Sequence, residues 1–533
     1  MSDSLNRERP AGAQAADPTS QPSLEAVRRS DRRIALAIYV ACVVVYGLVA
    51  GQRLLHPSSD THFVYQTECF LQRRLDLGRT PPHSNDWAEV ETLTLRDGST
   101  IAGQFQRTSP GRFRLLDGRS RTVADSEIAA RSRKYYVSFP PFPAVLLLPL
   151  VAIFGHRTND VLFTVLLAGV APALMFWVLR RWPQHLRPRG ASRLADGVAD
   201  PVSSPMPAAL DLQASLWLTT LFAFGTVYFF CSVLGQVWFT AHVVSLVFCA
   251  LYFVALLHPL RPGLAGLCIG ALFLTRPQMA ALGLLFLFEL ARAYHPEDRY
   301  PASLLDLRRS LRGDAGAAEP RRRSPLAPLL RFLLASGTLA LLGMAHNYLR
   351  FGKPLEFGHS FLTTMQADNI QRFGLVNYQY LARNLATALA LLPKFLPTSP
   401  YLQISYHGLA LWVTTPAWLF LLRSQPDVAA STTGADAGRD NRRIFVRVLW
   451  LCCVPIALAS LLYQNTGYVQ FGYRFSLDYT LPLLLLLSLS LRLPLSRGFC
   501  LCVVWGVLVN LFGALTFSRY WQFYFNGSFP VPF

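Results

Sequence analysis

The sequence has few charged residues. Asp, Glu, Lys and Arg together make up 15% of its 533 residues, whereas soluble globular proteins carry about 25%. Lysine is the scarcest of the four, with three residues in the chain (Lys134, Lys353 and Lys394). This shortage of charge excludes an ordinary soluble enzyme. It also excludes an intrinsically disordered chain, because such chains are rich in charge and poor in apolar residues.

The cysteines do not follow a pattern typical of disulfide-bonded or zinc-binding domains. The nine cysteines include no Cys-x-x-Cys pair and no Cys/His cluster, and only Cys69 falls outside the apolar runs. A disulfide scaffold and a structural zinc site are therefore not expected. The sequence also lacks a Gly-rich phosphate loop, a Gly-x-Ser-x-Gly motif and a His-Glu-x-x-His motif, so the common nucleotide, hydrolase and metalloprotease sites are not predicted.

The chain is instead rich in long apolar runs. Hydrophobic residues make up 52% of it, and the mean hydropathy is +0.30. A bilayer core needs about 20 apolar residues in a helix, and none of the runs alternates like a barrel strand. The sequence therefore predicts an all-α polytopic membrane bundle of about 11–12 transmembrane helices. The runs lie at 34–55, 137–154, 160–179, 212–234, 237–257, 263–290, 326–348, 408–422, 444–463, 475–491 and 499–517.

The charge is distributed as in a polytopic membrane protein. The formal net charge is +19, but the arginines cluster in short stretches between apolar runs, which disfavours nucleic acid as a partner. Four arginines within 28–33 directly precede the first run, and no convincing cleavage site follows it. The positive-inside rule then places the N-terminus in the cytoplasm and the first loop outside.

The first outer loop is expected to contain a small β insert at about 88–131. Short alternating runs are separated there by Asp97-Gly98, Pro110-Gly111 and Asp117-Gly118. Asp-Gly between such runs is a strong hairpin signal. We expect four or five short strands in a compact sheet or a small barrel that packs on the bundle or docks a partner.

The order of runs and loops predicts how the chain is divided. The expected segments are a disordered cytoplasmic tail (1–33), the first transmembrane helix (34–55), a first outer loop (56–136), a transmembrane bundle (137–348), a second large outer loop (349–407), a further bundle (408–517) and an outer C-terminal tail (518–533). Two topologies stay open. In the first, 137–154 crosses the membrane fully. In the second, 137–154 is re-entrant and the run at 263–290 is split near Arg276-Pro277. They agree from residue 292 onwards.

Asp60 is the first candidate for chemistry. It lies a few residues beyond the first run, before an amphipathic stretch that can lie along the membrane interface. A carboxylate there can act as a general base or hold a divalent cation. The alternative is a helix cap, because Ser58, Ser59 and Asp60 are all good N-cap residues.

Other candidates are ionisable groups near or inside the runs. Lys134, Arg276 and Arg474 lie near predicted outer ends of spans, where they bind a phosphate or simply extend to lipid headgroups. His242 shares a helix face with Trp238 and either binds substrate or is a buried, hydrogen-bonded histidine. Glu289 lies deep in an apolar run and is expected to pair with Arg292.

Several segments resemble the GT-C superfamily of integral-membrane glycosyltransferases. Asp60 past the first span, with Tyr65 a few positions on, is similar to the first outer loop of that family, although Thr61 stands where many members have a second acidic residue. The similarity covers roughly 34–490, and the β insert departs from it. Four further segments resemble bacterial members: Tyr-Val-Ser-Phe-Pro-Pro within 134–143, Leu-Thr-Arg-Pro-Gln at 274–278, Asn-Tyr-Leu-Arg-Phe-Gly-Lys-Pro-Leu-Glu-Phe-Gly at 347–358 and Gln-Phe-Gly-Tyr-Arg-Phe-Ser-Leu-Asp at 470–478.

The resemblance implies a multi-pass enzyme of the bacterial inner membrane. Such an enzyme moves a sugar from a polyprenyl-phosphate donor to an envelope glycan, lipid or protein acceptor on the outer face. Asp60 would be catalytic, and the candidate substrate ligands are Tyr65, Lys134, His242, Arg276 and Arg474. Membrane lipids are the other expected partners, no cofactor is certain, and a divalent cation stays an alternative.

Two other functions stay open. A transporter or flippase of lipid-linked glycans is one, and a catalytically inactive scaffold is the other. The sequence shows no convincing internal repeat of the kind that transporters often have. Its long predicted outer loops suit an extracytoplasmic enzyme better. The sugar, the acceptor and the oligomeric state are not determined by the sequence.

The predicted orientation can be tested at Ser120, inside the β insert. In intact spheroplasts, a Ser120→Cys variant should react with a membrane-impermeant thiol reagent, because the first loop is expected to lie outside. Labelling that occurs only after lysis would reverse the orientation of the first span.

Overall fold

A computed structural model describes most of the chain. The described residues are 24–107, 109–186, 210–257, 260–295, 298–312, 324–363, 367–422 and 435–527. The tail predicted at 1–33 therefore lies mostly outside the described part. Its last ten residues are described, and they continue the first helix, α1 (Leu24–Ala50), towards the N-terminus.

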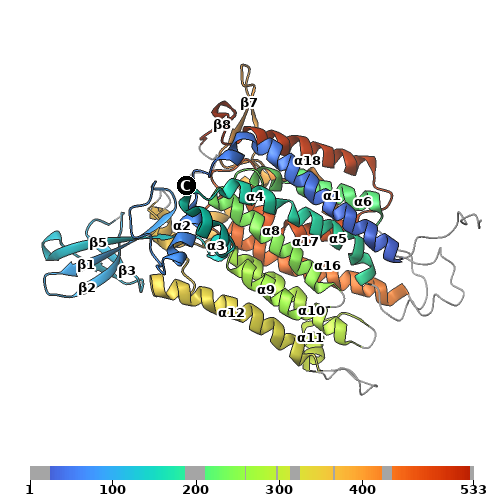
Figure 1. The fold of residues 1–533 in the computed structure, drawn as a ribbon, viewed down its shortest axis with the longest axis horizontal. Helices are drawn as coiled ribbons and strands as arrows, with labels where there is room; N and C mark the ends of the chain where they lie inside the picture. Colours follow the sequence, from blue (N-terminus) through green and yellow to red (C-terminus); the bar gives the residue numbers. More distant parts are fainter. Residues whose placement is uncertain are drawn as a thin grey trace, which may run out of the picture.

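The described part is a body of packed helices with a β-sheet projecting from one end (Figure 1). Six helical stretches are long and apolar enough to cross a membrane: Arg29–Leu55 (α1 and its continuation), Asp160–His185 (α4, Asp160–Ala168, and α5, Val170–His185), Val237–Leu256 (α8), Leu326–Phe351 (α12), Asp440–Leu461 (in α16, Ala435–Leu461) and Arg497–Thr516 (α18). The other helices are α2 (His62–Leu71), α3 (Phe142–Phe154), α6 (Leu212–Phe224), α7 (Tyr228–Cys231), α9 (Pro262–Phe273), α10 (Gly283–Tyr294), α11 (Leu304–Arg312), α13 (Ala367–Phe373), α14 (Leu381–Leu389), α15 (Leu411–Thr414) and α17 (Leu477–Ser490).

The expected count of about 11–12 full-length transmembrane helices is not confirmed. Several predicted spans are short or broken among the described residues. The run at 263–290 divides into α9 and α10, joined by a 3₁₀ segment that begins at Pro277. Proline breaks a helix because it lacks the N–H that the preceding turn requires. A single apolar run therefore does not always form one continuous helix.

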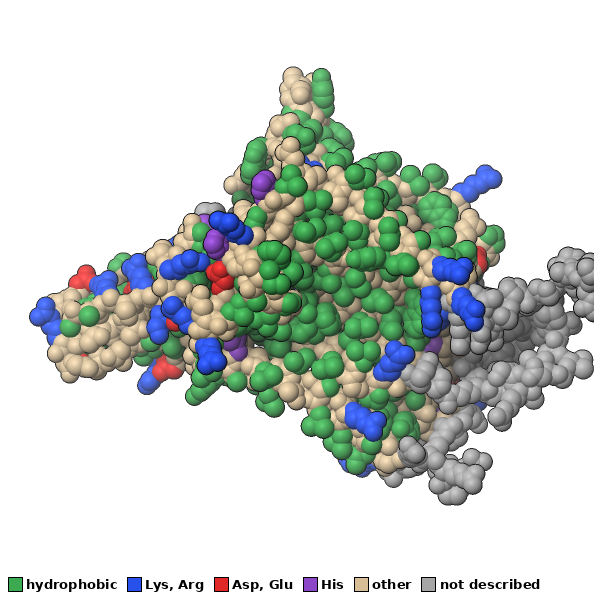
Figure 2. Space-filling model, in the orientation of Figure 1, with side chains coloured by type: hydrophobic (Ala, Val, Ile, Leu, Met, Phe, Trp, Pro, Cys, Tyr) green, Lys and Arg blue, Asp and Glu red, His purple; other side chains and the backbone are tan. Residues whose placement is uncertain are grey.

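Apolar side chains cover the middle of the helical body. Figure 2 shows this face as largely hydrophobic, with Lys and Arg side chains gathered at both ends. Long helices such as α12 expose large apolar residues, with Leu334 at 68% and Leu349 at 70% exposure. Monomeric soluble proteins rarely expose continuous apolar surface on this scale. The body is therefore suited to a bilayer.

The β insert is an antiparallel sheet of five strands in the order β4-β3-β2-β1-β5. Its strands are β1 (Trp87–Leu95), β2 (Thr100–Phe105), β3 (Arg112–Leu115), β4 (Ser120–Thr122) and β5 (Ile128–Val137). Positive φ angles at Gly98 and Gly118 form the turns that the Asp-Gly pairs predicted. The prediction of four or five strands is confirmed, and β5 extends the sheet to residue 137.

A second, smaller sheet was not predicted. It joins β6 (Lys394–Phe395), β7 (Leu402–Ser405) and β8 (Tyr524–Phe525). β8 pairs in parallel with β7, so the segment after α18 returns to the second large loop. Figure 1 shows this sheet at the same end of the body as the five-stranded sheet.

The motifs at 347–358 and 274–278 make structural contacts. Arg350 donates to the carbonyl of Val137 at 2.7 Å and to Asn347 Oδ1 at 2.8 Å, which joins the end of α12 to the end of β5. Arg276 and Gln278 both donate to the carboxylate of Asp478, which ends the motif at 470–478. The motifs at 274–278, 347–358 and 470–478 therefore join neighbouring elements of the fold.

A buried charge cluster lies at the opposite end of the helical body. Arg292 donates to Glu289 Oε2 from Nε at 3.1 Å and from Nη2 at 2.9 Å, so the predicted ion pair is confirmed. His185 Nε2 lies 2.9 Å from the same oxygen, and the hydroxyl of Tyr300 donates to Oε1. The cluster joins α5, α10 and the segment after α10.

This cluster predicts a strong effect of Glu289→Gln. Removing one partner of a buried pair leaves the other charge uncompensated and costs about 3–5 kcal/mol. We expect a large fall in the unfolding temperature of the detergent-solubilised variant. The control is Asp306→Asn, which removes a carboxylate from an exposed pair with Arg309 at 3.8 Å. Equal stability of the two variants would contradict a structural role for the cluster.

Candidate active site

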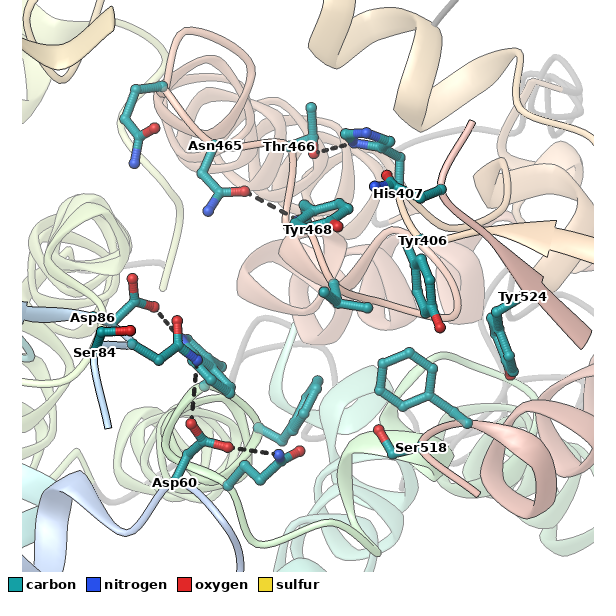
Figure 3. Close-up of a pocket in the computed structure, with 18 of the residues that line it drawn as sticks. Asp60, Ser84, Asp86, Tyr406, His407, Asn465, Thr466, Tyr468, Ser518 and Tyr524 are labelled. Atoms are coloured by element: carbon teal, nitrogen blue, oxygen red, sulfur yellow. Dashed lines mark hydrogen bonds between the residues drawn. The ribbon is translucent and has the colours of Figure 1, made fainter. Parts of the chain in front are cut away.

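A cavity of about 940 Å³ lies between the two sheets and the helical body. Its walls come from the segments before α2 and β1, the start of α8, the segment between α16 and α17, and the chain after α18. Figure 3 shows Asp60 and Asp86 on one side of it, with Tyr406, Tyr468 and Tyr524 facing them. Two carboxylates thus share a chamber with polar and aromatic side chains.

Asp60 is buried in the cavity wall and is held by three donors. Its Oδ2 accepts from Ser59 Oγ at 2.6 Å and from Gln236 Nε2 at 2.8 Å. Its Oδ1 accepts from Asn85 Nδ2 at 3.2 Å. Thr61, and not Asp60, is the N-cap of α2, and no side chain caps that helix. The alternative interpretation of Asp60 as a helix cap is therefore wrong.

Asp86 is a second carboxylate in the cavity, and the sequence analysis missed it. Trp238 Nε1 donates to its Oδ2 at 2.8 Å. Burial raises the pKa of Asp86 above its usual value, and the Trp238 hydrogen bond and the charge of Arg474 oppose that rise. An acidic residue next to Asn85 in a predicted outer loop was a visible signal. Only the fold brings Trp238 beside it.

Asp60 and two histidines lie close enough together to bind one metal ion. Asp60, His62 and His83 present ligand atoms within 4.8 Å of one another. His83 Nδ1 accepts from Asn85 N–H at 3.3 Å and from Trp87 Nε1–H at 3.4 Å, and its Nε2 faces Asp60 at 3.9 Å. Asp60, His62 and His83 are therefore the residues that would hold the divalent cation that the sequence left open.

His62 is fixed by its neighbours. Its ring stacks on Trp87 with centroids 4.1 Å apart, and its Nε2 lies 2.9 Å from the carbonyl oxygen of Asn85. Its Nδ1 is buried without a hydrogen-bond partner. Burial lowers the pKa of His62 to about 4. The neutral histidine therefore packs behind the part of the cavity wall that Asp60 forms.

Arg474 is the predicted phosphate ligand that lies nearest the cavity. It is 4% exposed and donates to the carbonyl of Val469 at 3.0 Å. Its guanidinium lies over the ring of Phe239 at 5.4 Å. Val469 and Phe239 both line the cavity, so Arg474 is packed directly behind the wall.

Arg276 and His242 meet at Asp478 and not at the cavity. Arg276 Nε and Nη2 donate to the two oxygens of Asp478 at 3.0 and 2.7 Å. His242 Nδ1 lies 3.3 Å from Asp478 Oδ1. His242 and Asp478 are fully buried, whereas the Arg276 side chain is 20% exposed. The three form a buried polar cluster inside the helical body.

Tyr65 and Lys134 also lie away from the cavity. Tyr65 packs edge-on against Trp87 with centroids 5.7 Å apart, and Arg79 lies over its ring. Lys134 is exposed on β5, opposite Val90 of β1. Among the six predicted site residues, Asp60 alone lines the cavity.

Three arginines in the cavity wall were not predicted. Arg519 donates to the carbonyls of Val49 and Ala50 at 2.7 and 2.5 Å. Arg383 and Arg107 each donate to a backbone carbonyl of a neighbouring segment, at 2.5 Å in both cases. Each lies in or next to a loop remote in sequence from Asp60, so no local pattern identified them. Together they give this chamber cationic groups beside its two carboxylates.

No family model matches the chain, and no curated protein matches it. Two solved structures are similar to it: the Archaeoglobus fulgidus oligosaccharyltransferase tethered to an acceptor peptide with an NVT sequon (TM-score 0.32), and the oligosaccharyltransferase AglB from the same organism in complex with an inhibitory peptide and a dolichol-phosphate (TM-score 0.34). Each is 11% identical, and the match covers 92% of this chain. The chain spans 56% of the length of those proteins.

The burial of His62 predicts a pH dependence of stability. The folded chain keeps His62 neutral down to a pKa of about 4, whereas the unfolded chain takes up a proton near a pKa of about 6.5. Its contribution to stability is therefore present above pH 6.5 and is lost as the pH falls towards 4. The slope approaches about 1.4 kcal/mol per pH unit for one proton.

Thermal unfolding in detergent between pH 7 and pH 4.5 checks this prediction. His62→Gln should lose less stability than the parent chain over that interval, and the same change at the exposed His56 should follow the parent chain. An unchanged slope in His62→Gln would contradict the prediction.

Proposed function

We propose that this chain is a membrane glycosyltransferase of GT-C type that moves a sugar from a polyprenyl-phosphate donor to an acceptor at the outer face of the bacterial inner membrane. The acceptor class is an envelope glycan, a lipid or a protein. The single observation that carries the proposal is the cavity, in which buried Asp60 and three arginines share one chamber beside long apolar helices.

The proposed reaction needs two kinds of groups. A carboxylate must engage the acceptor, and positive charge must stabilise the phosphate that departs. Asp60 provides the carboxylate, and Arg107, Arg383 and Arg519 provide cationic groups in the same chamber. Arginine suits this task because its planar guanidinium binds phosphate through two parallel hydrogen bonds.

The surroundings of the cavity suit a lipid-linked donor. The polar chamber adjoins a helical body whose exposed side chains are apolar (Figure 2). A prenyl chain can lie against such helices while its phosphate reaches the polar end. The facing wall offers Tyr406, Tyr468 and Trp521, together with amide side chains that suit the hydroxyl groups of a sugar.

The roles predicted for Tyr65, Lys134, His242 and Arg276 stay predictions. None of these residues lines the cavity in the described conformation. Arg474 is in a better position, because it lies behind the wall and its charge acts on Asp86. Within the proposal, Arg474 therefore acts through its positive charge, which favours the ionised form of Asp86 from behind the cavity wall.

Asp60→Asn tests the proposal directly. The change keeps the size of the side chain and removes its charge, so we expect normal amounts in the membrane fraction. Transfer should fall by about 10²–10⁴-fold, because the acceptor loses the charged carboxylate that engages it. The assay supplies undecaprenyl phosphate carrying a ¹⁴C-labelled hexose or pentose to membranes from a strain that lacks the chain and is complemented with each variant.

Asp97→Asn is the matched control. Asp97 lies in the β1–β2 turn, where its carboxylate accepts from Ser99, and it does not line the cavity. We expect it to retain full activity. Full activity of Asp60→Asn would remove Asp60 from the reaction. No transfer by the parent chain to any glycan, lipid or protein would contradict the proposed function and favour a transporter.

A further inference from the structure

The two carboxylates of the cavity differ in how many donors they bind. Asp60 accepts three hydrogen bonds, from Ser59, Asn85 and Gln236. Asp86 accepts one side-chain hydrogen bond, from Trp238, among the described residues. An ionised carboxylate offers about four acceptor positions. Asp86 therefore has more unused capacity to receive a proton, whereas Asp60 is nearly saturated.

The charges around Asp86 also suit a base. Its neighbours are Arg474, which favours the ionised form, Asp60, which disfavours it, and His83. The charge of Asp86 also acts on Tyr463. Burial is the largest influence and raises the pKa of Asp86. A carboxylate whose pKa is raised towards the working pH is a stronger base once it is ionised.

The backbone holds Asp86 in an unusual conformation. Its φ is +55°, in the left-handed region that few residues other than glycine adopt. Its carbonyl accepts from Ser138 Oγ at 2.8 Å, and the next residue, Trp87, is 2% exposed at the start of β1. Such conformations persist where the surrounding structure fixes them, and they concentrate at active sites. The sheet thus fixes the carboxylate at the cavity wall (Figure 3).

We infer that Asp86 is the general base that takes the proton from the acceptor, and that Asp60 holds the acceptor hydroxyl in position. The inference rests on the proposed function. In this step the acceptor O–H bond breaks and its proton passes to Asp86. The acceptor oxygen forms a bond to the anomeric carbon of the donor. The bond between that carbon and the phosphate oxygen breaks, and its electrons leave with the polyprenyl phosphate. Asp86 then releases the proton to water.

Trp238 is the positioning residue for Asp86. Its indole N–H is the donor to Oδ2, and a hydrogen bond to the ionised form lowers a carboxylate pKa. Trp238→Phe keeps a large aromatic ring but removes this donor. The pKa of Asp86 should then rise, and the acidic limb of the rate profile should move to higher pH by about one unit.

The experiment is a pH–rate profile of kcat/KM for the parent chain and three variants, with the labelled undecaprenyl-phosphate sugars named above. Asp86→Asn preserves the acceptor for Trp238, and asparagine also tolerates a positive φ. We expect its activity to fall by about 10²–10⁴-fold and the acidic limb to disappear. Asp60→Asn should lose activity but keep the acidic limb. Trp238→Phe should lose part of the activity and show a displaced acidic limb, because the donor that positions Asp86 is gone.

The outcomes separate this inference from the proposed function. If the parent chain is active, two results overturn the role of Asp86 alone. One is a pH–rate profile of Asp86→Asn that keeps its acidic limb unchanged. The other is an acidic limb that disappears in Asp60→Asn instead. An undisplaced limb in Trp238→Phe also overturns it. A parent chain that transfers no sugar overturns the proposed function, and the role of Asp86 in that reaction fails with it. Asp97→Asn should match the parent chain throughout.

Discussion

The carboxylate of Asp60 ties together three segments from different parts of the chain. Ser59 belongs to its own segment, Asn85 to the loop before the five-stranded sheet, and Gln236 to the start of α8. Val237 adds a backbone hydrogen bond to the carbonyl of Asp60 at 3.2 Å. The wall of the cavity depends on this network. The network holds the loop that contains Asp86 against α8, the helix that contains Trp238.

The membrane imposes a second constraint on the fold. Ionisable groups inside an apolar helical body are costly unless they are paired. Glu289 meets Arg292 at one end of the body, and Asp478 meets Arg276 in its interior. In both cases the carboxylate also lies beside a histidine, His185 or His242. Both clusters join helices inside the body, and the substrate roles predicted for His242 and Arg276 stay predictions.

The two sheets complete the cavity from opposite sides. The five-stranded sheet contributes Arg107, and the segment that follows β7 contributes Tyr406 and His407. Tyr406 stacks on Tyr524 of β8 with centroids 5.8 Å apart. The described residues after α18, as far as 527, therefore contribute to the cavity wall. A packing role for the β insert and a role in the site are compatible, because its first strand begins directly after Asp86.

Much of the architecture follows from local sequence. Apolar runs predicted helices, because an isolated bilayer helix must satisfy its own backbone groups. Asp-Gly pairs at 97–98 and 117–118 predicted the turns of the sheet, since only a few residues adopt the required backbone angles. Spacing along one helix was enough to predict the Glu289–Arg292 pair. The number of full-length spans was not settled by the sequence, which left open whether the run at 263–290 continues or breaks near Pro277.

The site was only partly predictable, for a physical reason. Asp60 was identified because a carboxylate just beyond a first span is a local feature of the chain. Asp86 became a candidate only through Trp238, which lies on a different element and donates to it at 2.8 Å. Arg519 and Arg383 likewise join the cavity through backbone contacts with remote segments. Local patterns in the chain predicted the helices, the turns and one candidate carboxylate. Tertiary structure alone decided which charged groups share one chamber, because hydrogen bonds between distant segments leave no periodic pattern in the chain.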